Sequence, residues 1–459
     1  MASDPMHSLI RRIAGEIESA GGRAYHVGGF VRDALLGLDR SASIDYDVEV
    51  YGLPLADLED LLRRHGRVEA VGRSFGILRF AAAGGEADFG LPRRENKTGR
   101  GHRGFLVDLD PDIAPAEACA RRDFTVNAML MDILTGEVLD FHGGREDLAA
   151  RVLRHTSDAF DEDPLRVYRL MQFAGRLEFD AAPETLALCR GIDLGPLAPE
   201  RVFAEFENLL LGAARPSRGL AVAREAGVLE VHPELKAMVG CPQDPEWHPE
   251  GDVWEHTLMV VDRAAAMRSG ERRHDLVLMF AALCHDLGKP ATTRRRQGRI
   301  VSPNHSEEGL APTRRLMERL TRDRDLVERV VEMVRLHLRP AEYYRARQRI
   351  RNGTIRRLAL EANIAELVEV ARADHLGRTT PDALAGEFPA GDWLLERAAE
   401  LSVEREPPRP ILMGRHLLER GWQPGPVLGE LLEAAYAAQL EGAFDDLDGA
   451  LDWLDARED

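Results

Sequence analysis

The sequence predicts an α+β protein in which a small first domain with a mixed sheet precedes several mostly helical domains. Short alternating runs of apolar and polar residues are confined to roughly the first 150 of the 459 residues. Helical periodicity dominates from residue 160 onward. A Pro-, Asp- and Gly-rich segment at residues 241–253 and a proline-rich run at residues 407–410 divide the helical part. We expect domains at residues 1–150, 151–245, 246–380 and 381–459.

Bulk composition indicates a globular cytoplasmic protein with no membrane segment. Hydrophobic residues make up 44% of the chain, and no apolar run reaches the roughly 18 residues of a membrane span. The first ten residues lack a basic region followed by an apolar core, so we expect no signal peptide. The four cysteines are scattered and form no CxxC pair, which is typical of reduced thiols.

The net charge of −18 argues against nucleic-acid binding over the whole surface. Binding follows local patches, however, and basic clusters occur. They lie at residues 93–103, 121–122, 294–296 and 345–357. A solvated polar face is the alternative for each cluster.

Two glycines, Gly28 and Gly29, form a turn before a predicted helix that carries Arg32 and Asp33 in its first turn. Glycine lets backbone N–H groups approach a phosphate closely, and the start of a helix adds partial positive charge. The turn is therefore a candidate triphosphate site, although Gly-Gly alone is common in ordinary turns.

Residues 44–50 alternate as a strand and carry Asp45 and Asp47. Because side chains alternate across a strand, both carboxylates point to one face, about 6 to 7 Å apart at the backbone. That spacing suits two Mg²⁺ ions about 3.5 to 4 Å apart that promote in-line attack on a phosphate. Asp-x-Asp alone is also common on polar strand faces.

Together these two features resemble the signature of the nucleotidyltransferase superfamily that contains DNA polymerase β. More narrowly they resemble class II tRNA nucleotidyltransferases and bacterial poly(A) polymerases. The resemblance implies that Asp45 and Asp47 bind the two catalytic Mg²⁺ ions. Asp88, on a later predicted strand, is a candidate third carboxylate. A polar position on an exposed strand face is the alternative for Asp88.

The segment Arg121 to Met129 closely matches the RRDFTxNAM motif of this family. Adjacent arginines offer bidentate forks to a triphosphate, so Arg122 joins the proposed phosphate site. Asp123 can accept from a ribose hydroxyl or orient Arg122, and Asn127 suits a ribose or phosphate contact. A capped helix start explains Asp123 equally well, and both roles are compatible.

Asp163 and Arg166 lie three residues apart on one face of a predicted helix that begins near Pro164. In the family that this segment resembles, such a pair presents acceptors and donors to the pairing edge of CTP or ATP. Arg169, one turn further, is a candidate helper. An ordinary N-cap followed by proline accounts for Asp163 but not for the two arginines.

Two further segments carry structural expectations. Residues 92–118 lack periodicity, and we expect a long structureless loop. In the family such a flexible loop is needed to add the terminal A, and its length here favours CCA addition over CC addition. Arg201 and Glu205, at i and i+4 in a predicted helix, are expected to form an ion pair.

Downstream, His256, His285-Asp286 and Asp374 occur in an order that resembles the HD phosphohydrolase superfamily. Imidazole and carboxylate together suit a divalent ion such as Mn²⁺, Ni²⁺ or Mg²⁺ held between helices. His305 and His337 are further candidate ligands. The resemblance implies phosphatase, 2′-nucleotidase or 2′,3′-cyclic phosphodiesterase activity. Surface histidines are the alternative, because the chain has 15 of them.

The sequence therefore predicts a nucleotidyltransferase head, a helical neck and body, an HD domain and a helical tail. We expect a CCA-adding tRNA nucleotidyltransferase that uses tRNA, CTP and ATP. A poly(A) polymerase, a CC-only or A-only adding enzyme and an inactive nucleotide-binding regulatory protein are the alternatives. The tail suits tRNA binding, packing or a homodimer contact, and its end is acidic.

Overall fold

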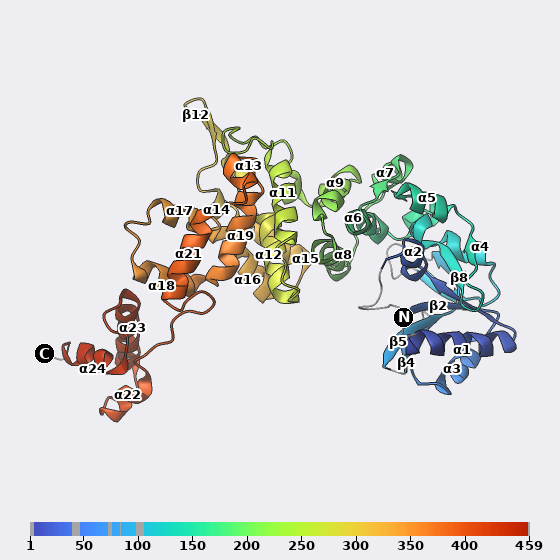
Figure 1. The fold of residues 1–459 in the computed structure, drawn as a ribbon, viewed down its shortest axis with the longest axis horizontal. Coiled ribbons are helices and arrows are strands. Elements are labelled where there is room, and N and C mark those ends of the chain that lie inside the picture. Colours follow the sequence, from blue (N-terminus) through green and yellow to red (C-terminus); the bar gives the residue numbers. More distant parts are fainter. Residues whose placement is uncertain (1–3, 39–45, 72–75, 83, 98–104, 458–459) are drawn as a thin grey trace. The chain divides into compact units, whose positions relative to one another are not determined.

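A computed structural model describes residues 4–38, 46–71, 76–82, 84–97 and 105–457 (Figure 1). The chain divides into two compact units, each with its own interior. The first contains residues 1–205 and 218–231, and the second contains residues 206–217 and 232–459. Sheet and helices in the first unit and helices in the second confirm the predicted α+β class.

The first unit is built on a seven-stranded mixed sheet in the order β3-β4-β5-β2-β1-β8-β9. Only β2 and β5 pair in parallel among these seven strands as the structure describes them. The strands are β1 (Arg23–Val27), β2 (Tyr46–Tyr51), β3 (Arg67–Val71), β4 (Ile77–Ala82), β5 (Gly85–Gly90), β8 (Met129–Asp132) and β9 (Val138–Asp140).

Helices α1 (Pro5–Ser19) and α3 (Leu55–Arg63) pack their apolar stripes against one face of this sheet. In β2, Tyr46, Val48 and Val50 point into that core. Side chains alternate along a strand, so Asp47 and Glu49 project from the opposite face. The hydrophobic pattern of β2 therefore places the predicted carboxylates on the face opposite α1 and α3, where Tyr51 also packs in a smaller apolar core with Ile113 and Cys119.

The expected structureless loop at residues 92–118 is wrong for the part that the structure describes, whereas residues 98–104 lie outside the described residues. Instead β6 (Arg93–Lys97) pairs antiparallel with β7 (Phe105–Leu109), and α4 (Pro115–Ala120) follows. Backbone groups make the ladder bonds, so a polar strand with no apolar alternation pairs with the apolar run in β7. Periodicity alone does not reveal such a strand.

The remaining elements up to residue 231 are mostly short helices, of which α2 and η1 lie between strands of the sheet and the others come after β9 in the chain. They are α2 (Gly29–Leu35), η1 (Thr125–Asn127), α5 (Gly144–Ala150), β10 (Val152–Leu153), η2 (Asp158–Glu162), α6 (Leu165–Leu177), β11 (Asp180–Ala181), α7 (Pro183–Cys189), α8 (Pro199–Gly212), α9 (Pro216–Glu225) and η3 (Val228–Val231).

The second unit surrounds α12, whose residues from Asp275 to Cys284 are all buried. A helix that is buried on every side forms the centre of a domain. Its neighbours α11, α16 and α19 pack around it (Figure 1). The elements are α10 (Pro233–Lys236), α11 (Val253–Ala265), α12 (Arg272–Cys284), α13 (Lys289–Thr292), β12 (Arg294–Arg296), β13 (Arg299–Val301), α14 (His305–Glu308), α15 (Leu310–Leu320), α16 (Arg324–Leu336), α17 (Arg339–Arg345), α18 (Asn352–Glu361), α19 (Ile364–Leu376), α20 (Pro381–Leu384) and α21 (Pro389–Glu400).

The tail consists of α22 (Gly414–Glu419), α23 (Pro426–Glu441) and α24 (Leu447–Asp455), which enclose a small apolar core that includes Leu417 and Phe444. An ion pair between Arg357 and Glu441 links α23 to α18. Among the described residues, none of the helices combines the length and apolar character needed to cross a membrane.

Gly288 gives a test of how tightly the second unit is packed. A Cβ atom at Gly288 would lie 2.0 Å from the carbonyl oxygen of His305 and 2.5 Å from Gly309 N. Gly288→Ala must therefore separate α13 from α14, and overpacking of this kind typically costs about 1 to 3 kcal/mol. We expect a lower midpoint of denaturant unfolding for the second unit.

Gly429→Ala is the matched control, because a Cβ there meets nothing within 4 Å inside α23. Alanine in a helix interior is favoured over glycine by about 0.5 to 1 kcal/mol, so this variant should be at least as stable as the wild type. Equal unfolding midpoints for the two variants would contradict the packing described here.

Candidate functional site

The face of the sheet opposite α1 and α3 brings two of the predicted carboxylates side by side. Asp47 in β2 is the register partner of Asp88 in the parallel strand β5, so both project from the same face. Asp88 also forms an ion pair with Arg79, with Nε and Oδ1 3.2 Å apart. Asp45 lies outside the described residues.

The glycine turn lies beside Arg122. Gly28 has φ +60°, a backbone conformation that favours glycine, and a Cβ there would be 3.5 Å from Arg122 Nη1. Arg122 Nη2 is 2.7 Å from Glu49 Oε2. Burial alone would lower the pKa of Arg122, but the Glu49 carboxylate outweighs burial and the pKa is raised. Glu49 was not predicted, although its place two residues after Asp47 puts it on the same face.

A chain of hydrogen bonds joins the other predicted nucleotide-binding residues of the first unit. Arg32 donates from Nε to Asp33 Oδ1 at 2.7 Å and from Nη1 to Asn127 Oδ1 at 2.8 Å. Asn127 Nδ2 in turn donates to Asp123 Oδ1 at 3.0 Å. Arg169 Nε donates to Asp123 Oδ2 at 2.7 Å. Residues spread over α2, η1 and α6 therefore form one network.

The ring of Phe173 packs against two guanidinium groups of this network. The guanidinium carbons of Arg32 and Arg169 lie 5.2 Å and 5.1 Å from the centre of its ring. Contacts of this length are favourable cation–π interactions. Burial alone would raise the pKa of Asp123, but Arg169 outweighs it and the pKa is lowered. Phe173 was not predicted, although it follows Arg169 by one helical turn.

Asp163 and Arg166, the predicted base-selecting pair, are each held by other groups. Asp163 Oδ1 accepts from the backbone N–H of Leu165 at 3.1 Å, and Oδ2 is 2.8 Å from Arg201 Nη2. Arg166 donates to the carbonyl oxygens of Ala159 and Arg121 at 2.5 Å and 2.6 Å.

The ion pair expected between Arg201 and Glu205 is replaced by two others. Arg201 pairs with Asp163, and Glu205 Oε1 lies 3.9 Å from Arg169 Nη1. Helical spacing places Arg201 and Glu205 on one face, but each pairs with a residue more distant in the sequence, Asp163 and Arg169 respectively.

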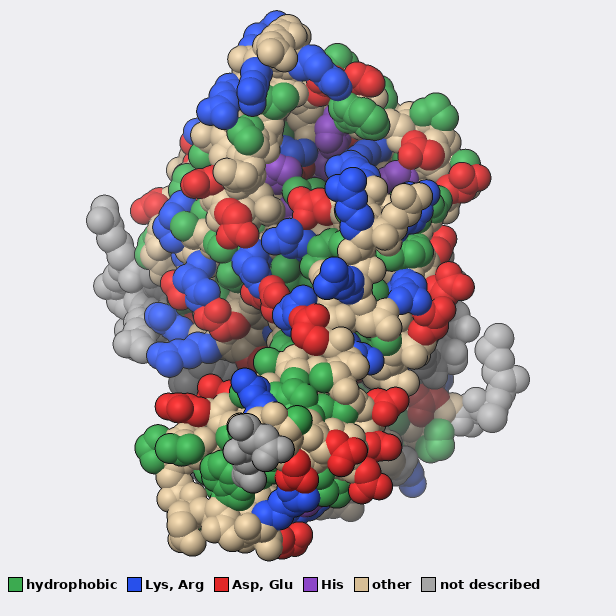
Figure 2. All heavy atoms as spheres, turned by 90° about the vertical axis from the view of Figure 1, so that its left-hand side faces the viewer, with side chains coloured by type: hydrophobic (Ala, Val, Ile, Leu, Met, Phe, Trp, Pro, Cys, Tyr) green, Lys and Arg blue, Asp and Glu red, His purple; other side chains and the backbone are tan. Residues whose placement is uncertain are grey.

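In the second unit, buried imidazoles and carboxylates from separate helices converge. His256 from α11 places Nε2 3.1 Å from Asp374 Oδ1 of α19. His285 Nε2, at the end of α12, is 3.1 Å from Asp286 Oδ2 and 3.9 Å from Asp374 Oδ1. All four side chains are less than one-tenth exposed. Figure 2 shows histidines in a hollow of this unit, with lysine and arginine side chains around it.

The two further candidates, His305 and His337, lie on the other side of Asp286. His305 Nε2 is 3.4 Å from Asp286 Oδ1. One potential ligand atom from each of Asp286, His305 and His337 lies within 4.8 Å of the others. Asp286, His305, His337 and Asp374 line a cavity of about 260 Å³, and His256 and His285 lie behind it in contact with Asp374 and Asp286.

The backbone fixes which nitrogen of each ring faces the cavity. His285, His305 and His337 each place Nδ1 within 2.8 Å of a carbonyl oxygen three residues earlier in the chain. A carbonyl accepts only from a protonated nitrogen, so in the neutral imidazole Nε2 keeps its lone pair. That arrangement is typical of metal-binding histidines.

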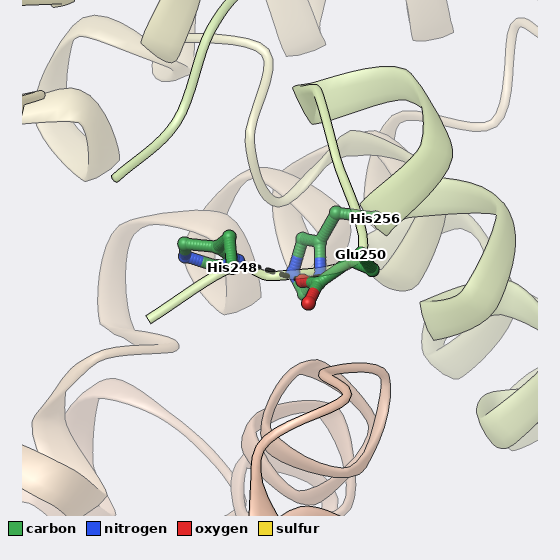
Figure 3. A group of neighbouring side chains, drawn as sticks. All are labelled: His248, Glu250 and His256. Carbon is green, nitrogen blue, oxygen red and sulfur yellow. Dashed lines mark hydrogen bonds and ion pairs between the residues drawn. The ribbon is translucent and has the colours of Figure 1, made fainter. Parts of the chain in front are cut away.

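Two side chains missed by the sequence analysis, His248 and Glu250, extend this cluster. Figure 3 shows the Glu250 carboxylate beside the neighbouring rings of His248 and His256. Glu250 Oε1 lies 2.9 Å from His248 Nδ1 and 2.8 Å from His256 Nδ1. The signal was present in the segment His248-Pro249-Glu250, but a short polar loop carries no periodicity.

Positive charge balances the buried carboxylates. Lys289 Nζ is 2.7 Å from Asp286 Oδ2, and Arg378 Nη2 is 3.3 Å from Asp374. Burial alone would raise the pKa of Asp286, but His285 and Lys289 hold the pKa well below its usual range. Arg378 and His256 act in the same way on the pKa of Asp374, against burial. Both groups are thus carboxylates at neutral pH.

The donor set fits a divalent metal ion. Burial lowers the pKa of His337 to about 3, so its imidazole is neutral, as a metal ligand must be. His337 Nε2 is buried and has no hydrogen-bond partner among the residues that the structure describes. Imidazole nitrogens and carboxylate oxygens around one cavity are ligands that divalent transition metals accept.

Two known protein families match separate parts of the chain. The Poly A polymerase head domain family matches residues 24–154, and the HD domain family matches residues 253–379. The first match contains the glycine turn, β2 and the Arg122 segment. The second contains His256, His285, Asp286 and Asp374.

Solved structures share the fold at low sequence identity. The CCA-adding enzyme of Bacillus stearothermophilus in complex with CTP has a TM-score of 0.66 and 22% identity, with 99% of each chain covered. The Thermotoga maritima CCA-adding enzyme complexed with tRNA has a TM-score of 0.59 and 18% identity, with 99% of this chain and 96% of that chain covered.

Two curated relatives are similar over most of their length. The Multifunctional CCA protein of Xanthomonas campestris pv. campestris (strain B100) is 38% identical over 437 residues, which cover 92% of this chain and 98% of that protein. The Multifunctional CCA protein of Xylella fastidiosa (strain 9a5c) is 38% identical over 397 residues, with 83% and 90% covered. The chain belongs to the family of multifunctional CCA proteins.

Proposed function

We propose that this protein is a CCA-adding tRNA nucleotidyltransferase that extends tRNA 3′ ends from CTP and ATP, and that its second unit hydrolyses phosphate esters. Kinship with multifunctional CCA proteins over 92% of the chain is the observation that carries the first activity. Structural neighbours bear CTP and tRNA in their complexes, which supports the same substrates. The buried His–Asp cluster carries the second activity.

In the head, Asp45, Asp47 and Asp88 would hold Mg²⁺, which when bound neutralises developing charge during in-line phosphoryl transfer. Arg122, anchored by Glu49 beside the Gly28 turn, is placed to contact a triphosphate. The anchored guanidinium keeps free N–H donors, since only one of its terminal nitrogens contacts Glu49. The turn itself has no side chain to block the backbone.

Asp163 and Arg166 are our proposed readers of the incoming base. A carboxylate offers about four lone-pair sites, so Asp163 can accept from a base in addition to Leu165 and Arg201. Arg201 fixes Asp163, and two backbone carbonyls fix Arg166. Both side chains are thereby oriented before nucleotide binds, which lowers the entropy cost of reading the base.

At the second site, His256, His285, Asp286 and Asp374 would hold a divalent ion, with His305 and His337 as additional ligands. Mn²⁺ or Ni²⁺ suits the imidazole-rich set better than Mg²⁺ does. When bound, such an ion lowers the pKa of a coordinated water. Hydrolysis joins a water oxygen to phosphorus, breaks the P–O bond of the ester and returns a proton to the leaving alcohol. Lys289 and Arg378 supply positive charge for the phosphate.

A tRNA that lacks its CCA end tests the first activity. We expect CTP alone to add two residues and ATP then to add one, measured as product length on a sequencing gel. Open-ended addition from ATP alone would instead identify a poly(A) polymerase. Addition of C only would identify a CC-adding enzyme, and no addition would indicate an inactive head.

Separate variants should divide the two activities. Asp47→Asn removes a charge from the proposed Mg²⁺ site, so we expect nucleotide addition to fall by at least about 10²-fold while phosphate-ester hydrolysis persists. Asp286→Asn should do the reverse. If Asp47→Asn kept full nucleotide addition, our assignment of the head site would be wrong.

Glu250 gives a third prediction, because it contacts His256 on the side away from the cavity. A carboxylate partner raises the basicity of a metal-binding imidazole, and its loss typically weakens metal binding about 10- to 100-fold. We expect Glu250→Gln to raise the apparent Kd for Mn²⁺ by this factor in calorimetric titration.

Glu255→Gln is the matched control for that titration. Glu255 precedes His256 on α11 but its side chain is exposed, so the variant removes an equal charge without touching the cluster. We expect wild-type Mn²⁺ affinity for this control. Equal affinities for Glu250→Gln and the control would contradict a role of Glu250 in orienting His256.

A further inference from the structure

Trp247 is exposed in a way that its four counterparts are not. All five tryptophans of the chain lie in described residues, and the other four are buried or half-buried. Trp247 is 51% exposed. Burying a large aromatic side chain is strongly favourable. An indole left in solvent therefore indicates either a binding role or a surface position at which any side chain is tolerated.

The position of Trp247 favours a binding role. Its side chain lines the same cavity as Asp286, His305, His337 and Asp374. The next residue, His248, packs edge-on against His256 with ring centres 4.6 Å apart. The exposed indole therefore stands at the wall of the proposed metal centre.

The loop that carries Trp247 is held in place on both sides. Arg299 of β13 contacts Asp244 Oδ2 at 3.1 Å and Glu246 Oε2 at 2.8 Å. Glu250, three residues after Trp247, is fixed between two imidazoles. An aromatic ring on an anchored loop is presented with little loss of conformational entropy on binding.

Positive charge lies on the same wall. Arg345, at the end of α17, is exposed and lines the cavity with Trp247. Arg294, Arg295 and Arg296 in β12 do not line this cavity, but β12 pairs with β13, whose Ile300 does. All three arginines are exposed, and no ion pair to them occurs among the described residues. In a chain of net charge −18, this local concentration of unneutralised arginine is unusual.

We propose that Trp247 is a stacking platform for the nucleobase of the ester cleaved at this centre, with Arg345 as a phosphate contact. The inference rests on the proposed phosphohydrolase activity and adds a base-binding subsite to it. A flat indole face accepts any base, because every base has a π-face. The proposed subsite binds the base of the ester, while the metal centre and Arg345 bind its phosphate.

The test compares a substrate that has a base with one that lacks it. The kcat/KM values for 2′-AMP and for ribose 2-phosphate are measured with Mn²⁺ for wild type, Trp247→Ala and Trp247→Phe. Stacking on an aromatic side chain contributes about 1 to 3 kcal/mol. We therefore expect Trp247→Ala to lower the ratio of the two values by about 5- to 150-fold, mainly through KM. Phenylalanine, which also stacks, should restore most of the ratio.

Val427→Ala removes an exposed apolar side chain from the tail and serves as the control, with the wild-type ratio expected. A wild-type ratio in Trp247→Ala, or an equal fall for both substrates, would overturn the inference. A wild type that hydrolyses neither substrate refutes the phosphohydrolase activity instead. Calorimetric binding of 2′-AMP to wild type and Trp247→Ala then decides the subsite alone: weaker binding to the variant supports it and equal binding overturns it.

A further arm separates free nucleotides from RNA ends as the source of the ester. It uses a short RNA that ends in a 2′-phosphate and a variant with alanine at Arg294, Arg295 and Arg296. Loss of kcat/KM for the RNA but not for 2′-AMP supports the base subsite on an RNA end. Equal kcat/KM values in variant and wild type for both substrates support the subsite on a free nucleotide.

Discussion

Two buried carboxylates, Asp286 and Asp374, set the strongest constraint on the second unit. Moving a charge out of water costs several kcal/mol unless other charges and hydrogen bonds offset that cost. Here Lys289, Arg378 and the surrounding imidazoles supply the offset. The architecture follows from this requirement: α12 and α16 each end in a histidine at the cluster, and Gly288 lets α14 approach closely enough to add His305.

The first unit meets a similar constraint by a different route. Its buried charges are joined in one hydrogen-bonded chain from Arg32 through Asn127 and Asp123 to Arg169. Phe173 lies against both guanidiniums, so the cations pack on an apolar ring rather than on water. The network links α2, η1 and α6, and the carboxylates of β2 and β5 lie on the face of the sheet opposite α1 and α3.

Much of this could be predicted from the sequence, because motifs fix residue types and helices fix spacing. His256, His285, Asp286 and Asp374 were expected together and lie in contact in one buried cluster. What the sequence could not show were contacts made by loops and by backbone groups. Glu250 and Trp247 lie in a loop without periodicity, and the polar strand β6 pairs through its backbone alone. Arg201 pairs with Asp163, which is far away in the sequence, and not with Glu205, its neighbour on the helix.

The most direct measurement is anomalous diffraction from crystals of the full chain grown with Mn²⁺. The account predicts a strong anomalous peak enclosed by His256, His285, Asp286 and Asp374, with no such peak in Asp286→Asn. Crystals in which Mn²⁺ occupies only surface sites, while the buried cluster shows no anomalous density, would contradict the assignment of this cluster as a metal centre.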